Sequence, residues 1–211
     1  MVSLDMNFGY IPSTIDGSEH IFGAETPMTT LPKSYSYKRF LPGVLDQGSR
    51  SICVPCSVSA YLNWRENLKT GSKKDNKIDY DEIYDVRSND GDGMTFKEAF
   101  RYLRHHGVSS KAGVLKINEY AMIKNGGALK VALVMNGPCF GALPVYNSRD
   151  EFWKSGPGDC FCGYHAISIV GYNEEGFIIR NSWGPTFGNN GYSTLKFEDY
   201  PKLVEVWTIV I

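Results

Sequence analysis

A cysteine at the expected start of a helix is the first residue in the sequence that suggests chemistry. Cys53 follows the turn-forming segment 47–52 and precedes a run with helical apolar spacing. The N-terminus of a helix carries partial positive charge and unpaired N–H groups, which favour a thiolate. The thiolate is the nucleophilic form, so Cys53 is a candidate nucleophile. Taken alone, a buried structural cysteine is the more ordinary interpretation.

A histidine and an asparagine further along the chain could complete such a site. His165 opens an apolar run, and Asn181 ends another run just before Trp183. Each has an ordinary structural interpretation, a hydrogen-bonded histidine at a strand edge and an asparagine in a turn. A histidine can accept and return a proton near neutral pH, however, and an amide can hold its ring. The order Cys, His, Asn is therefore more specific than any one of the three residues.

The helices that would position these residues are predicted from apolar spacing. Helices are expected over about 53–68, 96–106 and 128–135. Pro55 is tolerated only in the first turn, so the first of these helices begins at about Cys53. A threonine at position 95 and a glutamate at position 98 predict a capping box for the second helix.

After Pro138 the sequence changes to short runs rich in β-branched and aromatic residues, separated by Gly, Asn and Pro. The expected strands are 139–146, 166–172, 177–180, 192–197 and 205–211. This texture predicts an α+β chain with a helical half over about 47–125 and a β half over about 126–211. A cleft between two unlike halves is a natural place for a site.

The first thirty residues have a different character from the rest. Residues 1–30 lack periodic apolar spacing and contain several Gly and Pro residues, so they are predicted to form an extended N-terminal arm before a single domain over 31–211. The longest apolar runs are too short to span a bilayer, and the N-terminus lacks the pattern of a secretory leader.

The composition narrows the classes of partner and compartment. The 211 residues include 22 basic and 23 acidic side chains, with a formal net charge of −1. This balance predicts no binding to nucleic acid or to an anionic membrane surface. The five cysteines are an odd number without a disulfide spacing pattern, which indicates a reducing compartment, intracellular or particle-associated. The oligomeric state is not predicted.

One cysteine pair has to be weighed as a metal site. Cys160 and Cys162 lie close to His165 in the sequence. They supply only two neighbouring thiols, and no second pair follows at the spacing of a zinc site. No metal and no other cofactor is predicted.

Several ordered segments of the chain resemble the papain and cathepsin family of cysteine peptidases. Besides the segments around Cys53, His165 and Asn181, the similar stretches are 31–35, 91–94, 136–138 and 152–156. The resemblance covers residues from about 31 to 197, and the local motifs around the cysteine and the asparagine are characteristic of that family. It implies a papain-like fold of two subdomains, with a helical N-terminal half and an antiparallel β-sheet or barrel in the C-terminal half.

The resemblance also implies roles for four residues. Cys53 would attack a peptide carbonyl, and His165 would pair with the thiolate and then protonate the leaving amine. Asn181 would accept a hydrogen bond from His165 and hold its ring. The side-chain amide of Gln47 and the backbone N–H of Cys53 would form an oxyanion hole.

Five further residues are expected to bind or shield the substrate, a protein or peptide. Trp183 would cover the histidine–asparagine pair, and Gly93 would offer backbone hydrogen bonds to an extended chain. The residues expected to shape the main specificity pocket are Met94, Ala142 and Tyr164.

The sequence departs from the family in four respects. Val54 stands where the family usually has Trp, and Arg50 stands where it has a disulfide-forming cysteine. The distances along the chain from the cysteine to the histidine and asparagine are at or below the family's usual range, which indicates trimmed loops. Residues 1–30 are too short for the usual inhibitory propeptide, and we hypothesise that this arm itself lies in the cleft.

The predicted function is therefore cysteine peptidase activity through an acyl-enzyme, with amide or isopeptide hydrolysis as a related possibility. The alternative is a structural or binding protein of the same fold, such as a particle or virion component, with little or no turnover. A degenerate relative usually lacks a catalytic residue. Gln47, Cys53, His165 and Asn181 are all present, which favours the enzyme.

Overall fold

The computed structural model describes residues 8–23 and 30–210. Of the predicted arm over 1–30, residues 1–7 and 24–29 lie outside the described part, as does residue 211. The described part of the arm makes two isolated contacts with strands, at Tyr10 and at Ile21, and forms no helix.

The described residues form four α-helices. They are α1 (Cys53–Thr70), α2 (Tyr80–Tyr84), α3 (Phe96–His105) and α4 (Gly126–Met135). Helix α1 begins at Cys53 with a proline in its first turn, as predicted, and ends at Gly71, which takes a left-handed conformation with φ 63°.

The starts of the other helices are set by side-chain caps. Helix α3 has the predicted capping box, in which Thr95 and Glu98 each bind the other's backbone N–H. Helix α4 begins two residues earlier than predicted because Asn125 caps the N–H of Ala128. Helix α2, which was not predicted, is too short for a periodic pattern and depends on its cap, Asp79.

The strands form one antiparallel sheet in the order β2-β7-β3-β4-β5-β6, with β1 added against β4. Their bounds are β1 (Tyr35–Ser36), β2 (Glu119–Met122), β3 (Cys139–Val145), β4 (Gly163–Tyr172), β5 (Gly176–Arg180), β6 (Tyr192–Lys196) and β7 (Val206–Val210). The five predicted strands are all present. The prediction missed β1 and β2, whose short stretches are defined only by their partners in the sheet.

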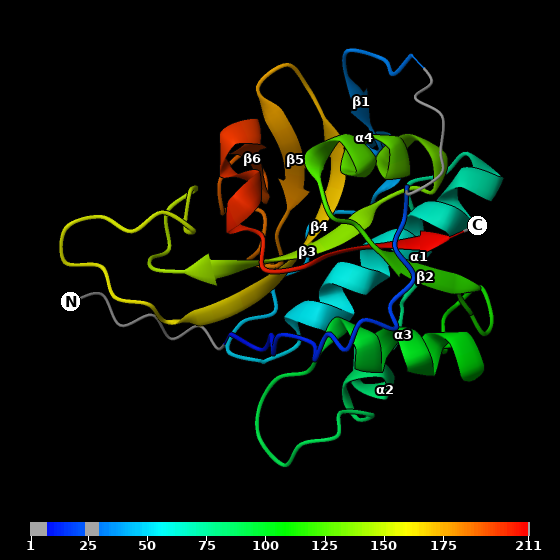
Figure 1. Ribbon diagram of the computed structural model, residues 1–211. Coiled ribbons are helices and arrows are strands. Elements are labelled where there is room, and N and C mark those ends of the chain that lie inside the picture. The colour runs from blue at the N-terminus through cyan, green and yellow to red at the C-terminus, as the bar shows by residue number, and fades with distance from the viewer. Residues whose placement is uncertain (1–7, 24–29, 211) are drawn as a thin grey trace.

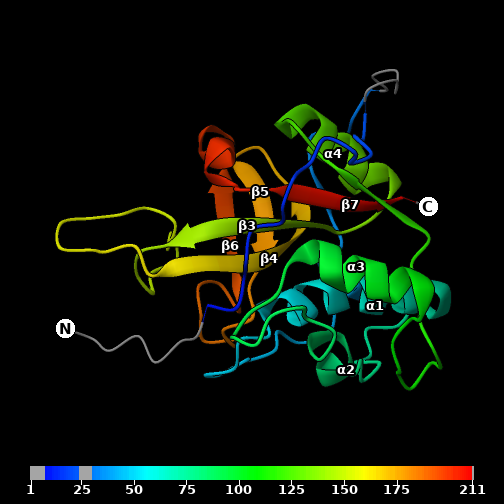
Figure 2. The ribbon, with the colours of Figure 1, turned by 60° about the horizontal axis from the view of Figure 1, so that its bottom comes forward.

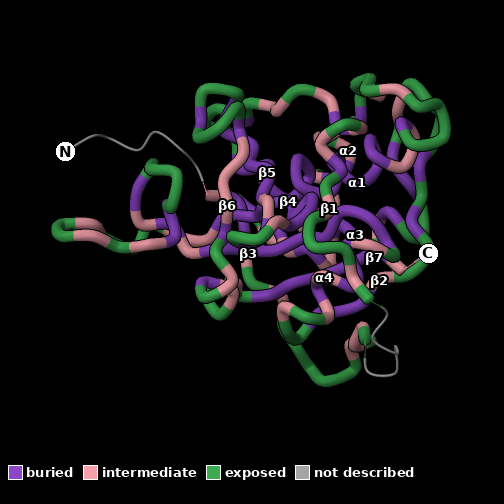
Figure 3. The backbone as a smooth tube through the Cα atoms, turned by 90° about the horizontal axis from the view of Figure 1, so that it is seen from above, coloured by how far each residue is buried: buried purple, intermediate pink, exposed green. Residues whose placement is uncertain are grey.

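Helices cover both faces of this sheet. Helices α1, α2 and α3 gather on one side, and α4 lies on the other (Figures 1 and 2). One hydrophobic cluster joins α1 and α3 to β3 and β7, and a second joins α4 to β3, β4 and β5. Figure 3 shows the buried backbone in the centre and a largely exposed excursion between β3 and β4. The architecture is α+β, as predicted.

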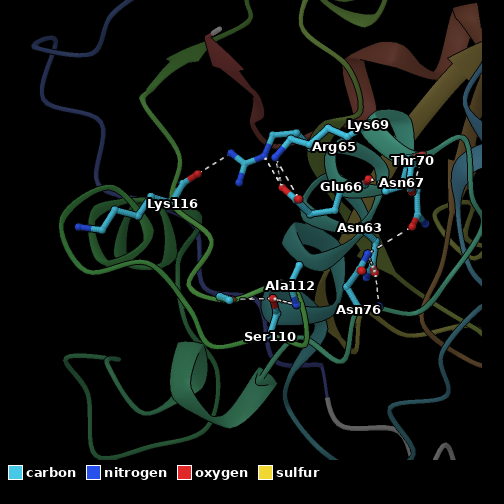
Figure 4. A network of polar contacts seen from close by, with 11 residues as sticks. Asn63, Arg65, Glu66, Asn67, Lys69, Thr70, Asn76, Ser110, Ala112 and Lys116 are labelled. Carbon is cyan, nitrogen blue, oxygen red and sulfur yellow. Dashed lines mark hydrogen bonds and ion pairs between the residues drawn. The ribbon is translucent and has the colours of Figure 1, made fainter.

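The polar loop after α1 is fixed by hydrogen bonds to side chains of that helix. Most residues of the run 69–77 are exposed. Asn63 and Asn67 of α1 nevertheless bind it, because Asn63 Oδ1 accepts from the backbone N–H of Asn76 at 2.9 Å and Asn67 Nδ2 donates to the Lys74 carbonyl at 2.8 Å (Figure 4). This network fixes the C-terminal end of α1, the helix that carries Cys53 at its other end.

Candidate active site

Cys53 lies at the first position of α1 and is fully buried. Burial raises the pKa of its thiol to about 11, because a thiolate is poorly solvated in a dry environment. Hydrogen bonds from backbone groups of Ala166, Gly9 and Val54 act in the opposite direction.

His165 lies two residues after the start of β4, and its ring is fixed by Asn181, which follows β5. The distance between His165 Nε2 and Asn181 Oδ1 is 2.7 Å. Asn181 Oδ1 also accepts from the backbone N–H of Ser182 at 2.7 Å. Because that N–H can only donate, the amide atom facing both groups is the oxygen, and Nε2 must carry the ring proton. In the neutral ring Nδ1 is therefore the basic nitrogen.

Aromatic rings pack around His165, and the first of them is Trp183. Its ring centroid is 4.6 Å from that of His165, and it packs in turn on Phe152 at 4.8 Å and Phe187 at 5.0 Å. The burial lowers the pKa of His165 to about 4, although the bond to Asn181 favours the charged ring. Both the thiol and the imidazole are therefore neutral near neutral pH.

Helix α1, whose first residue is Cys53, packs against β4, which carries His165. Within the described residues, His165 Nδ1 has no hydrogen-bond partner. The third group, Gln47, is also buried there, and its Oε1 accepts from Ser182 Oγ at 2.6 Å while its Nε2 donates to the Arg50 carbonyl at 2.8 Å.

The arm lies across this site. Residues Gly9 to Ile11 pair with Met94, whose N–H donates to the Gly9 carbonyl at 2.9 Å and whose carbonyl accepts from the Ile11 N–H at 3.1 Å. On the other side, Tyr10 forms an antiparallel bridge with Tyr164. The predicted cleft between the halves is therefore filled by the chain's own N-terminal segment, in agreement with the hypothesis for the arm.

The predicted contact of Gly93 with a substrate stays a prediction, and within the chain its backbone groups bond to two side chains. The N–H of Gly93 donates to the Tyr84 hydroxyl at 3.0 Å and its carbonyl accepts from Asn89 at 3.1 Å, so the groups that pair with the extended arm are those of Met94. Gly93 contributes space instead: its φ is 94°, and a Cβ there would lie 2.9 Å from the Gly9 carbonyl oxygen.

The predicted pocket residues lie in or against the hydrophobic cluster that contains Tyr10. Met94 and Ala142 are buried in the same hydrophobic cluster as Tyr10, and Tyr164 packs against it. The ring of Tyr10 also lies 5.2 Å from that of Phe96. The sequence analysis did not include Phe96 in the site, because an aromatic residue at the start of a helix is usually interpreted as part of the hydrophobic core.

The described residues hold no group of three or more metal-binding side chains. Cys160 and Cys162 are exposed, and all five cysteines are free thiols. No helix in the described part of the chain is both long and apolar enough to span a bilayer.

Comparison with known proteins agrees with this arrangement. The model of the papain family cysteine proteases matches residues 105–203, a segment with His165 and Asn181 but without Cys53. The low-temperature-induced cysteine proteinase of Solanum lycopersicum is 29% identical over 194 residues, which are 77% of this chain and 56% of that protein. Procathepsin L of Mus musculus is 27% identical over 206 residues, 80% of this chain and 61% of that protein. The chain thus spans little more than half the length of these curated relatives.

Among solved structures, xylellain, a cysteine protease from Xylella fastidiosa, superposes with a TM-score of 0.80 at 22% identity, covering 97% of this chain and 96% of that one. The fold is therefore papain-like, with the two unlike halves that the sequence predicted. Over residues 105–203 the chain is similar to the papain family of cysteine proteases.

Proposed function

We propose that this protein is a cysteine peptidase that hydrolyses peptide bonds in protein or peptide substrates, with Cys53 as nucleophile. The observation that carries the proposal is the tautomer of His165. Asn181 fixes the ring proton on Nε2, which leaves Nδ1 as the base on the side of the ring that has no other partner among the described residues. A structural histidine would gain nothing from a buried, unpaired basic nitrogen.

The proposed reaction has two stages. Nδ1 of His165 takes the thiol proton of Cys53, and Sγ attacks the substrate carbonyl carbon. The C–N bond then breaks, and His165 returns the proton to the leaving amine, which leaves a thioester on Cys53. In the second stage His165 takes a proton from water, the hydroxide oxygen attacks the thioester carbonyl, and the acid product departs as Sγ regains its proton.

The oxyanion that forms in each stage needs donors fixed beforehand. The proposed donors are the backbone N–H of Cys53, at the start of α1, and the amide of Gln47. Support for Gln47 comes from its rigid setting: its backbone N–H donates to the Ser182 carbonyl at 2.8 Å, and both ends of its side-chain amide are bonded. These hydrogen bonds connect the loop that carries Gln47 to the loop that carries Asn181 and Ser182.

The test is hydrolysis of fluorogenic peptide amides together with labelling by an epoxide-type thiol inhibitor. The expected result is selective labelling of Cys53 and release of the amine, both lost in His165→Ala. Cys56→Ala, which removes the thiol one turn further along α1, is the matched control and should keep both. Since the arm covers the site, the assay is run on the full chain and on the arm variant Gly9→Ala.

Two outcomes would contradict the proposal. One is an accessible Cys53 that labels no faster than Cys160, which would mean that the thiol is not activated. The other is labelling of Cys53 without release of amine from any peptide tested, which is the result expected of a papain-fold binding or structural protein.

A further inference from the structure

Two of the five cysteines lie in the loop that connects β3 to β4 and take no part in the proposed reaction. Cys160 and Cys162 are exposed, whereas the other three cysteines are buried. Burial raises the pKa of the Cys53 thiol to about 11 and that of the Cys139 thiol to about 12, so neither forms much thiolate near neutral pH. A small reagent that does not resemble a substrate should therefore react first at Cys160 and Cys162.

The loop is fixed on both sides of these two cysteines. Before them, the carboxylate of Asp159 accepts from Asn147 Nδ2 at 2.9 Å. After them β4 begins, and the Cys162 N–H already donates to the Val145 carbonyl of β3 at 2.8 Å. The segment 160–162 therefore lies between two anchored points, within the exposed excursion between β3 and β4 that Figure 3 shows. Any change in its conformation is confined to three residues.

The side chain of Cys162 folds back toward Cys160. Its Sγ donates to the Cys160 carbonyl oxygen at 3.3 Å. Two residues of extended chain separate their Cα atoms by at most about 7 Å, and disulfides join Cα atoms about 4.4–6.8 Å apart. A bend within this segment, together with rotation about the Cα–Cβ bond of Cys160, is therefore sufficient to bring the two sulfur atoms together.

The residue between the two cysteines opposes that bend. Phe161 is itself exposed, yet its ring centroid lies 5.0 Å from that of Tyr164 and 6.0 Å from that of Tyr146. A bend at Phe161 changes the direction of its ring relative to these neighbours and weakens the hydrogen bond from Cys162 to Val145. A disulfide here would form against the packing of the open segment, and it would lie at the surface. Disulfides of this kind are readily reduced.

We propose that Cys160 and Cys162 form a redox-active dithiol, a modification site that reacts with low-molecular-weight disulfides such as oxidised glutathione. One thiolate attacks a sulfur of the small disulfide and expels a thiolate, which leaves a mixed disulfide on the protein. The second cysteine attacks the protein sulfur of that mixed disulfide, which closes the Cys160–Cys162 bond and expels the second small thiolate. Two protein thiols are oxidised, the small disulfide is reduced to two thiols, and these take up both protons.

The test incubates the full chain in glutathione buffers with a rising ratio of the oxidised to the reduced form, followed by intact mass measurement and labelling with a maleimide. The expected product has lost two hydrogen atoms and carries no glutathione. In the native oxidised protein the two exposed thiols no longer react with the maleimide, and after denaturation only the three buried cysteines do. Excess reduced glutathione should restore both labels.

Variants of the segment itself test the closure of the bond. Cys160→Ser and Cys162→Ser each keep one thiol of the pair, so each should stop at a mixed disulfide with one glutathione. Phe161→Gly removes the ring contacts and frees the backbone to bend, so its bond should close at a ratio of oxidised to reduced glutathione about 3–10-fold lower. Ser155→Gly, at another exposed position of the same loop, is the matched control and should leave the ratio unchanged.

Variants of the buried cysteines show whether the reaction is specific to the exposed pair. Cys56→Ala removes a buried thiol and should close the bond at the same ratio as the unmodified chain. Cys53→Ala should do so as well, although it cannot form an acyl-enzyme. The result therefore does not depend on the peptidase function proposed above.

Several outcomes would overturn the dithiol. Two glutathiones on one chain, or a disulfide between two chains, would mean that the two sulfur atoms of one loop do not meet. Loss of a buried thiol while both exposed thiols still label would mean that exposure does not select the reacting pair. Closure of the bond without peptide hydrolysis would uphold the dithiol and contradict the peptidase, and hydrolysis without closure would do the reverse.

Discussion

The helical half and the strand half hold their candidate catalytic groups by different means. Cys53 is the first residue of α1, so the helix backbone sets its position. His165 in β4 is positioned by side chains, through Asn181 on one edge and Trp183 on its face. A position that the helix backbone sets tolerates most substitutions nearby, whereas a ring held by side chains does not. The strand half should therefore be the more sensitive to substitution around its catalytic group.

The largest expected effect comes from removing the nucleophile. In the Gly9→Ala background, Cys53→Ala should lower the rate of peptide hydrolysis about 10⁴-fold or more, because no acyl-enzyme can form. Initial rates with a fluorogenic peptide measure this. Cys56→Ala in the same background should keep the rate within a few-fold, and a comparable loss in that control would show that α1 as a whole, rather than its first residue, supports catalysis.

Removing the support of the histidine tests the strand half. Asn181→Ala should lower kcat about 10²-fold with a smaller change in KM, because the ring loses its fixed tautomer and orientation. Steady-state kinetics give the two constants separately. Val54→Ala, beside the nucleophile, is the counterpart in the helical half. If it costs kcat as much as Asn181→Ala does, the contrast between the halves is wrong.

The free energy of unfolding should depend on pH in the acid range because the imidazole of His165 is buried. The pKa of His165 is lowered from 6.5 to about 4 by burial, so between these values the unfolded chain binds the proton more tightly than the folded chain. This contribution to stability is complete above about pH 6.5 and is lost as the pH falls toward 4. It should amount to about 1–3 kcal/mol in the free energy of unfolding.

Urea titrations at a series of pH values measure that dependence. In His165→Gln the free energy of unfolding should lack this part of its pH dependence. His20→Gln, at an exposed position of the arm, should keep it. An unchanged slope in His165→Gln would mean that other groups account for the loss of stability in acid.

The smallest effect is expected from a cap in the helical half. Thr95→Ala removes the hydroxyl that accepts from the Glu98 N–H at 3.1 Å and should lower the free energy of unfolding by about 1 kcal/mol, with kcat unchanged. Urea denaturation checks the stability, and Thr95→Ser, which keeps the oxygen, should restore it. A large loss of activity in Thr95→Ala would instead indicate that α3 positions the cleft directly.

Local signals in the sequence were sufficient for the elements that begin or end at a distinctive residue. Pro55 places the start of α1, and the pair Thr95 and Glu98 places the start of α3, because these effects act within one helical turn. The strands β1 and β2 could not be predicted, since two and four residues carry no periodicity and exist only by pairing with β4 and β7.

The sequence by itself determined the candidate catalytic set, because Gln47, Cys53, His165 and Asn181 are recognisable by type, order and local context. Only the tertiary structure decided that Met94 pairs with the extended arm, and that Gly9 lies too close to Ser51 to carry a side chain. These facts depend on which backbone groups face each other across segments far apart in the sequence. The electrostatic state of the site was decided in the same way, since the pKa values depend on the water that folding excludes.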